Sequence, residues 1–180
     1  DPMKKEKTGN ARSKTCYPFE LNQDDEHFDY TVNAEDEERE FETHPSIRFF
    51  SQDRQKGKTF EYELALCNPD LELLVTESMS NKDEIREMMR MNYEQAKERI
   101  KKTQKWNDVK TALDNTDWGN DEKKKHLIAA RYLSSVGKGE NALELCLALE
   151  ENHELENGDE HKKIFNVPPY IHKALVWLLR

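Results

Sequence analysis

The stretch LIAARYLSSVGKGENALELCLALE, from Leu127 to Glu150, carries the pattern that decides the predicted fold class. Its first part places apolar residues at helical spacing and ends at Gly137, a residue type that commonly terminates helices. Its second part holds seven apolar residues between Ala142 and Leu149, and only Glu144 interrupts them. A helix that is apolar on every side belongs in an interior, so we expect residues 140–151 to form the buried centre of a helical bundle.

Helical patterns also precede and follow this stretch. Between Ser80 and Lys102, apolar residues recur three or four positions apart and predict one long helix: Ile85, Met89, Tyr93, Ala96 and Ile100. Asn107 and Asn120 can each start a further helix, and Pro168-Pro169 precedes the last one. Residues 80–180 are therefore predicted to form a compact bundle of about five helices, which makes the protein mainly α.

Residues 46–79 follow a different period. In TFEYELAL, from Thr59 to Leu66, every second residue is apolar, which is typical of a strand with one buried face. Asn68-Pro69-Asp70 can form a turn, and the apolar residues that follow can return as a second strand. We expect a small antiparallel β-hairpin within 46–79, packed on the helices because a lone hairpin is marginally stable in water.

The charge of the chain is concentrated near its start. Eleven acids face one base between Glu20 and Glu42, a balance of −10, whereas the whole chain carries −9. Basic residues precede this segment, and like-charge blocks of this kind are typical of solvated arms. We therefore predict a basic, then acidic, flexible and largely irregular arm over 1–45, followed by a single globular domain over 46–180.

The cysteines and the chain ends bear on the cellular setting. Three cysteines without a CxxC pair or a signal peptide favour reduced thiols in the cytoplasm or the nucleus. No apolar run approaches the ~18 residues of a membrane span, so we expect no membrane partner. The opening Asp1-Pro2-Met3 and the apolar ending from Ala174 to Leu179 predict a fragment of a larger protein.

No motif for catalysis or metal binding stands out. Gly137-Lys138-Gly139 lacks the spacing of a phosphate-binding loop, and Glu150-x-x-His153 is a single pair where a di-iron bundle needs two. The cysteines and histidines show no zinc spacing, and Cys146 lies between leucines, which is typical of a core thiol. We expect no enzyme, no cofactor and no metal.

The segment from His126 to Glu151 resembles the middle helices of death-fold domains, most of all the caspase-recruitment domains of innate-immune RNA helicases. The resemblance covers under a third of the chain, and the segment 46–79 and the double proline depart from that pattern. Residues 157–180 are similar to the closing helix of an armadillo-type repeat, although the sequence holds no second copy at the required period. Both resemblances imply binding to other proteins rather than turnover of substrates.

The first functional hypothesis is a non-enzymatic protein–protein interaction module, an adaptor or scaffold part of a larger intracellular protein. Its predicted contact residues in the arm combine aromatic and acidic side chains: Phe19, Asp24, Asp25, Phe28 and Tyr30. In the domain, the predicted anchors are Trp106 and Trp118 at helix junctions, for which core packing is the alternative interpretation.

Two alternative functions use the charged segments. Two lysine-rich patches predict phosphate contacts of a nucleic-acid-associated domain, such as a death-fold-like domain of an RNA helicase, RNA-silencing or immune factor; these residues are Lys97, Lys101, Lys102, Lys105, Lys123 and Lys124. A solvated basic face is the plainer interpretation of the same lysines. The acidic arm could instead bind basic clients such as histones, although the identity of any protein partner is not encoded in these patterns.

Overall fold

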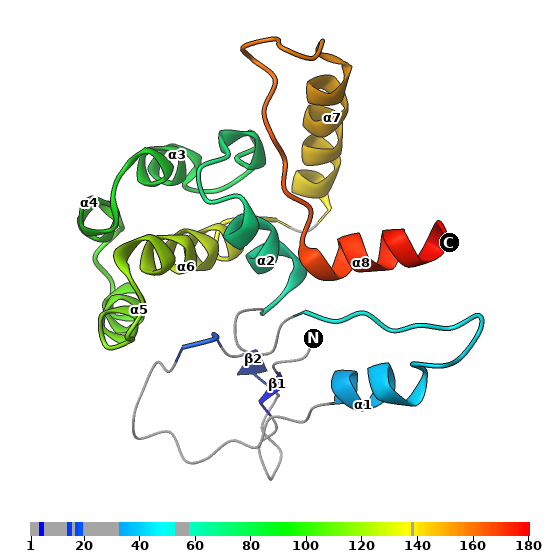
Figure 1. Ribbon diagram of the computed structural model, residues 1–180. Coiled ribbons are helices and arrows are strands. Elements are labelled where there is room, and N and C mark those ends of the chain that lie inside the picture. Colours follow the sequence, from blue (N-terminus) through cyan, green and yellow to red (C-terminus); the bar gives the residue numbers. More distant parts are fainter. Residues whose placement is uncertain (1–3, 6–13, 16, 20–32, 53–57, 138) are drawn as a thin grey trace.

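The computed structural model describes the chain except for residues 1–3, 6–13, 16, 20–32, 53–57 and 138 (Figure 1). Short strands β1 (Lys4–Lys5) and β2 (Lys14–Thr15) pair antiparallel. The helices within the described ranges are α1 (Asn33–Glu40), α2 (Phe60–Cys67), the 3₁₀ helix η1 (Glu72–Leu74), α3 (Lys82–Arg90), α4 (Tyr93–Arg99), α5 (Gln104–Asp114), α6 (Asn120–Leu133), α7 (Glu140–Glu154) and α8 (Pro169–Leu178). The prediction of a mainly helical, compact protein is confirmed.

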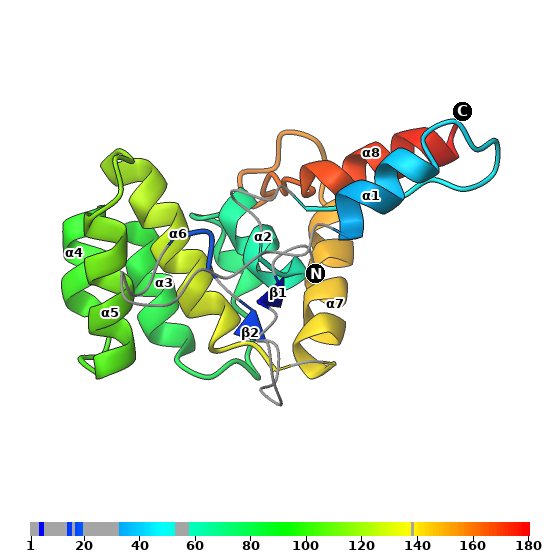
Figure 2. The same cartoon turned by 90° about the horizontal axis from the view of Figure 1, so that it is seen from below.

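Helix α6 forms the centre of the fold. Its residues from His126 to Tyr132 are buried in an unbroken run, with α2 on one side and α3, α4 and α5 on the other (Figures 1 and 2). The prediction that residues 140–151 form the buried centre is wrong, because α7, all of which is described, buries only Asn141 and Leu145. In both views α7 and α8 lie at the opposite end of the molecule from α3, α4 and α5.

The polar side chains of α6 have partners in the interior. The Arg131 guanidinium donates to the Glu84 carboxylate at 2.6 Å, and both side chains are largely buried. The His126 Nδ1 atom and the Tyr62 hydroxyl share a hydrogen bond of 2.6 Å. Because buried polar groups are tolerated when they are paired, these contacts allow a helix of mixed composition to occupy the centre.

The predicted hairpin in 46–79 is wrong, since the described residues of this segment form α2 and η1 and no strand. The Thr59 hydroxyl caps α2 by accepting a hydrogen bond from the Tyr62 backbone at 3.3 Å. Four consecutive residues, from Tyr62 to Ala65, are buried, whereas Phe60 is 47% exposed. An eight-residue run that is buried on most sides shows no reliable period, so its apolar alternation does not distinguish a strand from a helix.

The long helix predicted after Ser80 is divided in two at Met91 and Asn92. The Asn92 side chain accepts from the Gln95 backbone at 3.0 Å, and the Gln95 side chain accepts from the Asn92 backbone at 3.2 Å. This capping box starts α4 and raises the number of helices in the described part of 80–180 to six. All five residues of the predicted apolar face are nevertheless buried, which confirms the face itself.

Part of the predicted arm belongs to the core. Phe19 is only 7% exposed, and its ring meets those of Trp118 and His126 edge-on at 6.5 and 6.2 Å. The Lys58 ammonium lies 3.9 Å from the centroid of the Tyr17 ring. Residues 33–40 form α1, so the described portion of 1–45 is less irregular than predicted. The division into arm and domain stays a prediction.

We expect the loss of one partner of the Arg131–Glu84 pair to destabilise the fold more than the loss of both. Glu84→Leu leaves a buried guanidinium without its counter-charge and should lower the free energy of unfolding by about 3 kcal/mol in urea titrations. The double variant Glu84→Leu/Arg131→Met removes both charges and should lose less. Glu94→Leu is the matched control, because Glu94 pairs with Lys97 at 2.9 Å on the surface. Equal losses in all three variants would contradict this account.

Candidate interaction surface

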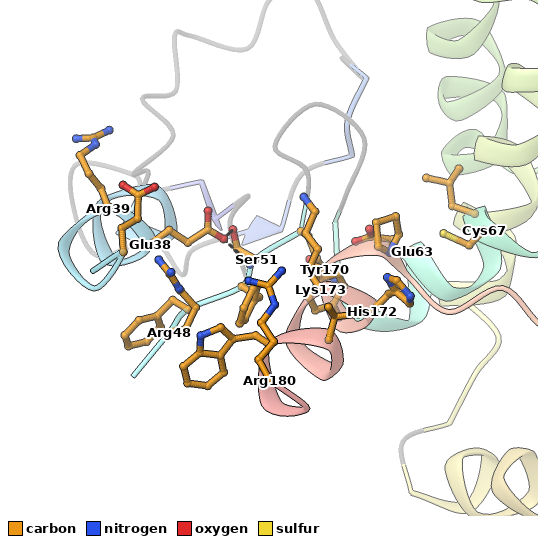
Figure 3. Close-up of a pocket in the computed structure, with 18 residues that line it drawn as sticks. Glu38, Arg39, Arg48, Ser51, Glu63, Cys67, Tyr170, His172, Lys173 and Arg180 are labelled. Atoms are coloured by element: carbon orange, nitrogen blue, oxygen red, sulfur yellow. Dashed lines mark hydrogen bonds between the residues drawn. The ribbon is translucent and has the colours of Figure 1, made fainter. Parts of the chain in front are cut away.

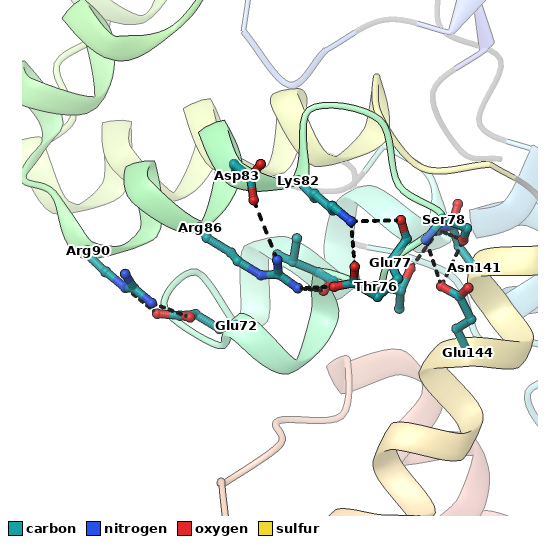
Figure 4. A network of polar contacts seen from close by, with 11 residues as sticks. Glu72, Thr76, Glu77, Ser78, Lys82, Asp83, Arg86, Arg90, Asn141 and Glu144 are labelled. Carbon is teal, nitrogen blue, oxygen red and sulfur yellow. Dashed lines mark hydrogen bonds and ion pairs between the residues drawn. The ribbon is translucent and has the colours of Figure 1, made fainter.

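Helix α7 is attached to the body through buried polar contacts rather than through a broad apolar face (Figure 4). Asn141, which is 2% exposed, donates from its amide nitrogen to the Thr76 and Ser78 hydroxyls, both at 2.7 Å. Its amide oxygen accepts from the Gly137 backbone. One turn later, the Glu144 carboxylate accepts from the Ser78 backbone at 3.1 Å and from its hydroxyl at 2.8 Å. These bonds fix the first half of α7 on the segment between η1 and α3.

This segment and η1 are secured on α3 by ion pairs (Figure 4). Glu77 pairs with Lys82 at 2.5 Å and with Arg86 at 2.9 Å, and Arg90 donates twice to Glu72 at 2.5 and 2.7 Å. The hydrogen bonds from Lys82 and Arg86 lower the pKa of Glu77 to about 2. The pKa of Glu144 is likewise lowered, chiefly because the Ser78 backbone donates to its carboxylate. The segment between η1 and α3 that carries α7 is thus held by carboxylates that stay ionised well below neutral pH.

With its rotation fixed in this way, α7 directs leucines toward solvent. Leu143 is 64% exposed and Leu147 is 51% exposed, and Ala142 and Cys146 beside them are exposed as well. We call these four residues the α7 leucine face. Leu145 on the opposite side is buried, and Leu149 packs against the core. Clustered apolar side chains on a surface mark interaction sites more often than isolated ones do.

Helix α8 is also peripheral, because none of its residues, all of which are described, is buried. Leu175, Leu178 and Leu179 near its end are 48%, 69% and 88% exposed. Its other side meets the segment before α2, where the rings of Trp177 and Phe50 lie 6.2 Å apart. The exposed leucines near the end of α8 therefore form a second apolar surface. The segment just before α8 is held by the buried Asn68, whose side chain forms two hydrogen bonds of 2.8 Å with the Asn166 backbone.

An open groove of about 1480 Å³ lies between α8, the end of α2 and residues 38–52 (Figure 3). Its charged lining includes the bases Arg39, Arg48, Lys173 and Arg180 and the acids Glu38, Glu42 and Glu63. Burial raises the pKa of the Cys67 thiol in this groove, which keeps the sulfur neutral and weakly nucleophilic. Within the groove, the Ser51 hydroxyl donates to the Glu38 carboxylate at 2.7 Å. The mixed charges of the lining select no single class of ligand.

Of the predicted aromatic anchors, Phe19 and Trp106 lie in the interior, Trp118 is half-buried, and the others lie outside the described residues. Trp106 is 4% exposed and lies against the Arg131 guanidinium at 5.1 Å. Trp118 is half-buried and stacks on His126 with ring centroids 4.3 Å apart. The expectation that Phe19 and Trp106 are exposed anchors is therefore corrected, because both fill the core. Asp24, Asp25, Phe28 and Tyr30 lie outside the described residues.

The structure separates the six predicted lysines into two groups. Three have partners within the molecule: Lys97 pairs with Asp114 at 3.1 Å, Lys124 pairs with Asp70 at 2.6 Å, and Lys123 donates to the Asp114 carbonyl at 3.3 Å. The other three, Lys101, Lys102 and Lys105, are exposed around the connection between α4 and α5 and form no ion pair with a described residue. Lys105 also lies over the Trp106 ring at 5.1 Å.

Comparisons with known proteins do not assign a family: no family model, curated protein or solved structure matches the chain. The resemblances to death-fold domains and armadillo repeats therefore gain no support. Within the described ranges, no cluster of three histidine, cysteine or acidic residues could hold a metal ion. No helix there is long and apolar enough to cross a membrane.

The α7 leucine face is the feature that the sequence analysis missed. A signal was present, because a polar Asn141 opens a run of leucines and Leu143 and Leu147 are four residues apart. That spacing places them on one side of a helix, away from Leu145. The apolar composition of the run by itself predicts full burial, whereas the spacing of its leucines indicates an exposed side.

We expect Asn141 to hold α7 in place. Asn141→Ala removes three hydrogen bonds and leaves buried polar groups unpaired, so the free energy of unfolding should fall by about 2 kcal/mol. Asn152→Ala on the same helix is the control, since among the described residues Asn152 bonds to the backbone of Lys163 at the surface. Urea titration gives the stabilities, and hydrogen exchange of α7 amides shows whether the loss is local. A loss no larger than that of the control would refute the role of Asn141.

Proposed function

We propose that this chain is a non-enzymatic protein–protein interaction module, an adaptor or scaffold part of a larger protein, and that α7 is its docking helix. One observation carries the proposal: a helix fixed by buried hydrogen bonds holds two leucines in solvent. The three cysteines, without a pair at metal or redox spacing, favour a location in the cytoplasm or the nucleus.

The energetics favour binding at this face. Fully burying an exposed leucine contributes roughly 1.5–3 kcal/mol. Leu143 and Leu147 are 64% and 51% exposed, so each gains part of that amount when a partner covers it. Because the polar network already fixes α7, docking loses little conformational entropy. Leucines on successive turns are the anchors that helical recognition modes use. The surface thus combines apolar area with preorganisation.

We expect Leu143→Ser/Leu147→Ser to abolish partner capture by the full chain without changing its stability. Proteins cross-linked to the wild-type chain in cell extract would be identified by mass spectrometry and compared with those bound to the variant. Leu178→Ser/Leu179→Ser on α8 is the matched control, because it removes an equal number of exposed leucines. A set of partners lost only with the α7 variant supports the proposal, whereas unchanged capture overturns it.

A nucleic-acid-associated function is the second candidate, and one observation favours it. The pKa of Lys110 is lowered, first by burial and then by the positive charges of Lys102 and Lys97. Lys97, Lys102 and Lys110 thus lie close enough for their charges to interact, with Asp114 acting in the opposite direction, and Lys101 and Lys105 are exposed nearby. The acidic-arm alternative, binding of basic clients such as histones, rests largely on residues outside the described ranges.

The salt dependence of binding tests the second candidate. If the lysines contact phosphates, the full chain should bind single-stranded RNA at low salt, and affinity should fall steeply as salt rises. Lys101→Gln/Lys102→Gln/Lys105→Gln should weaken binding and flatten the salt slope, while Lys123→Gln should change the slope little because Lys123 already bonds within the molecule. The absence of binding at low salt would dismiss this function.

A further inference from the structure

The outward side of α7 is divided into an apolar half and an acidic half. Leu143, Leu147, Glu150 and Glu154 follow one another at spacings of four, three and four residues, so they lie on one side of the helix. All four are exposed. Glu140 and Glu151 flank this line, and α7 contains five glutamates and no lysine or arginine. A ligand that covers this side must therefore present apolar groups to the leucines of the first half and positive charges to the carboxylates of the second half.

The acidic half is unfavourable for α7 itself. Glu150, Glu151 and Glu154 occupy the last turns, where the helix dipole presents its negative end and favours cations. The nearby Lys162 ammonium donates to the carbonyls of His153 and Leu155 rather than to these carboxylates. Among the described residues, no base forms an ion pair with these three glutamates. Positive charges from outside the chain would relieve this repulsion.

A second copy of α7 is a poor occupant of its own surface. Parallel pairing would bring the carboxylates of both copies together, which is repulsive. Antiparallel pairing would place the leucines of one copy against the glutamates of the other and desolvate those carboxylates without partners. The surface thus requires one ligand that carries positive charges for the glutamates and apolar groups for the leucines.

We propose that α7 binds an amphipathic helix whose contact side carries leucine-like residues in one half and lysine or arginine in the other. This inference rests on the proposed function, since it names the partner chemistry of the same surface. Two helices that pack along their length can bury Leu143 and Leu147 between apolar side chains and bring basic residues to Glu150 and Glu154. Apolar burial supplies affinity, and the charges set the alignment.

Designed peptides test this chemistry on the full chain. The probe is a fluorescein-labelled helical peptide of about 18 residues, with leucines on one side of its first half and lysines on the same side of its second half. A second peptide carries the lysines in its first half and the leucines in its second half, so that it can bind α7 in the opposite orientation. A third peptide of equal composition, with its leucines dispersed around the helix, reports attraction by charge alone. Fluorescence anisotropy gives the dissociation constants.

We expect one of the two patterned peptides to bind at least tenfold more tightly than the dispersed peptide. Leu143→Ser/Leu147→Ser should weaken this binding about tenfold, and Leu178→Ser/Leu179→Ser should leave it unchanged. Glu150→Lys/Glu154→Lys should also weaken it about tenfold and should create binding to a peptide with glutamates in place of lysines. Because all of these side chains are exposed, the variants should retain the circular dichroism of the wild type.

The other outcomes overturn the inference in distinguishable ways. Equal binding of the patterned and dispersed peptides would assign the attraction to charge alone, as the acidic segment 20–42 could provide. Loss of partner capture with Leu143→Ser/Leu147→Ser, but no peptide binding, would keep the proposed function and reject the basic helical partner. Unchanged capture together with unchanged peptide affinity would reject both.

Discussion

The burial of α6 depends on partners for the polar side chains that it carries into the interior. Arg131 meets Glu84 of α3, and His126 meets Tyr62 of α2, so each bond also links α6 to a neighbouring helix. Without these bonds, desolvation of an arginine and a histidine would oppose the packing of every helix around α6. The central position of α6 in turn leaves α7 at the edge of the fold, where its leucines meet solvent.

Patterns of apolar spacing predicted the elements with one exposed side well. The face from Ile85 to Ile100 was predicted correctly, even though a capping box at Asn92 divides the helix that carries it. Spacing failed for α2, whose short buried run has no reliable period. Composition predicted the wrong central helix. It favoured the leucine-rich residues 140–151, whereas the centre is α6, whose buried polar groups bond to residues of other helices. Those partners lie far away in sequence and leave no local signal.

The candidate surface could be predicted only in part for related reasons. Aromatic residues were expected to contact partners, but Phe19 and Trp106 contribute large apolar areas that the small core uses. Lysines were expected to form two patches, but Asp114 of α5 pairs with Lys97 and Asp70, in the turn after α2, pairs with Lys124, and these contacts neutralise part of both patches. The leucine face depends on the rotation of α7, and that rotation is set by Thr76 and Ser78, more than 60 residues earlier.

The buried Asn141 and the exposed leucines place different demands on evolution. A substitution at Asn141 disturbs hydrogen bonds of the fold, so any descendant that keeps the fold must keep this residue or replace its partners together with it. Leu143 and Leu147 contribute little to the fold, and neutral drift would soon exchange them for polar residues. Leucine retained at both positions among descendants is therefore a record of selection for contact with another molecule, independent of selection for stability.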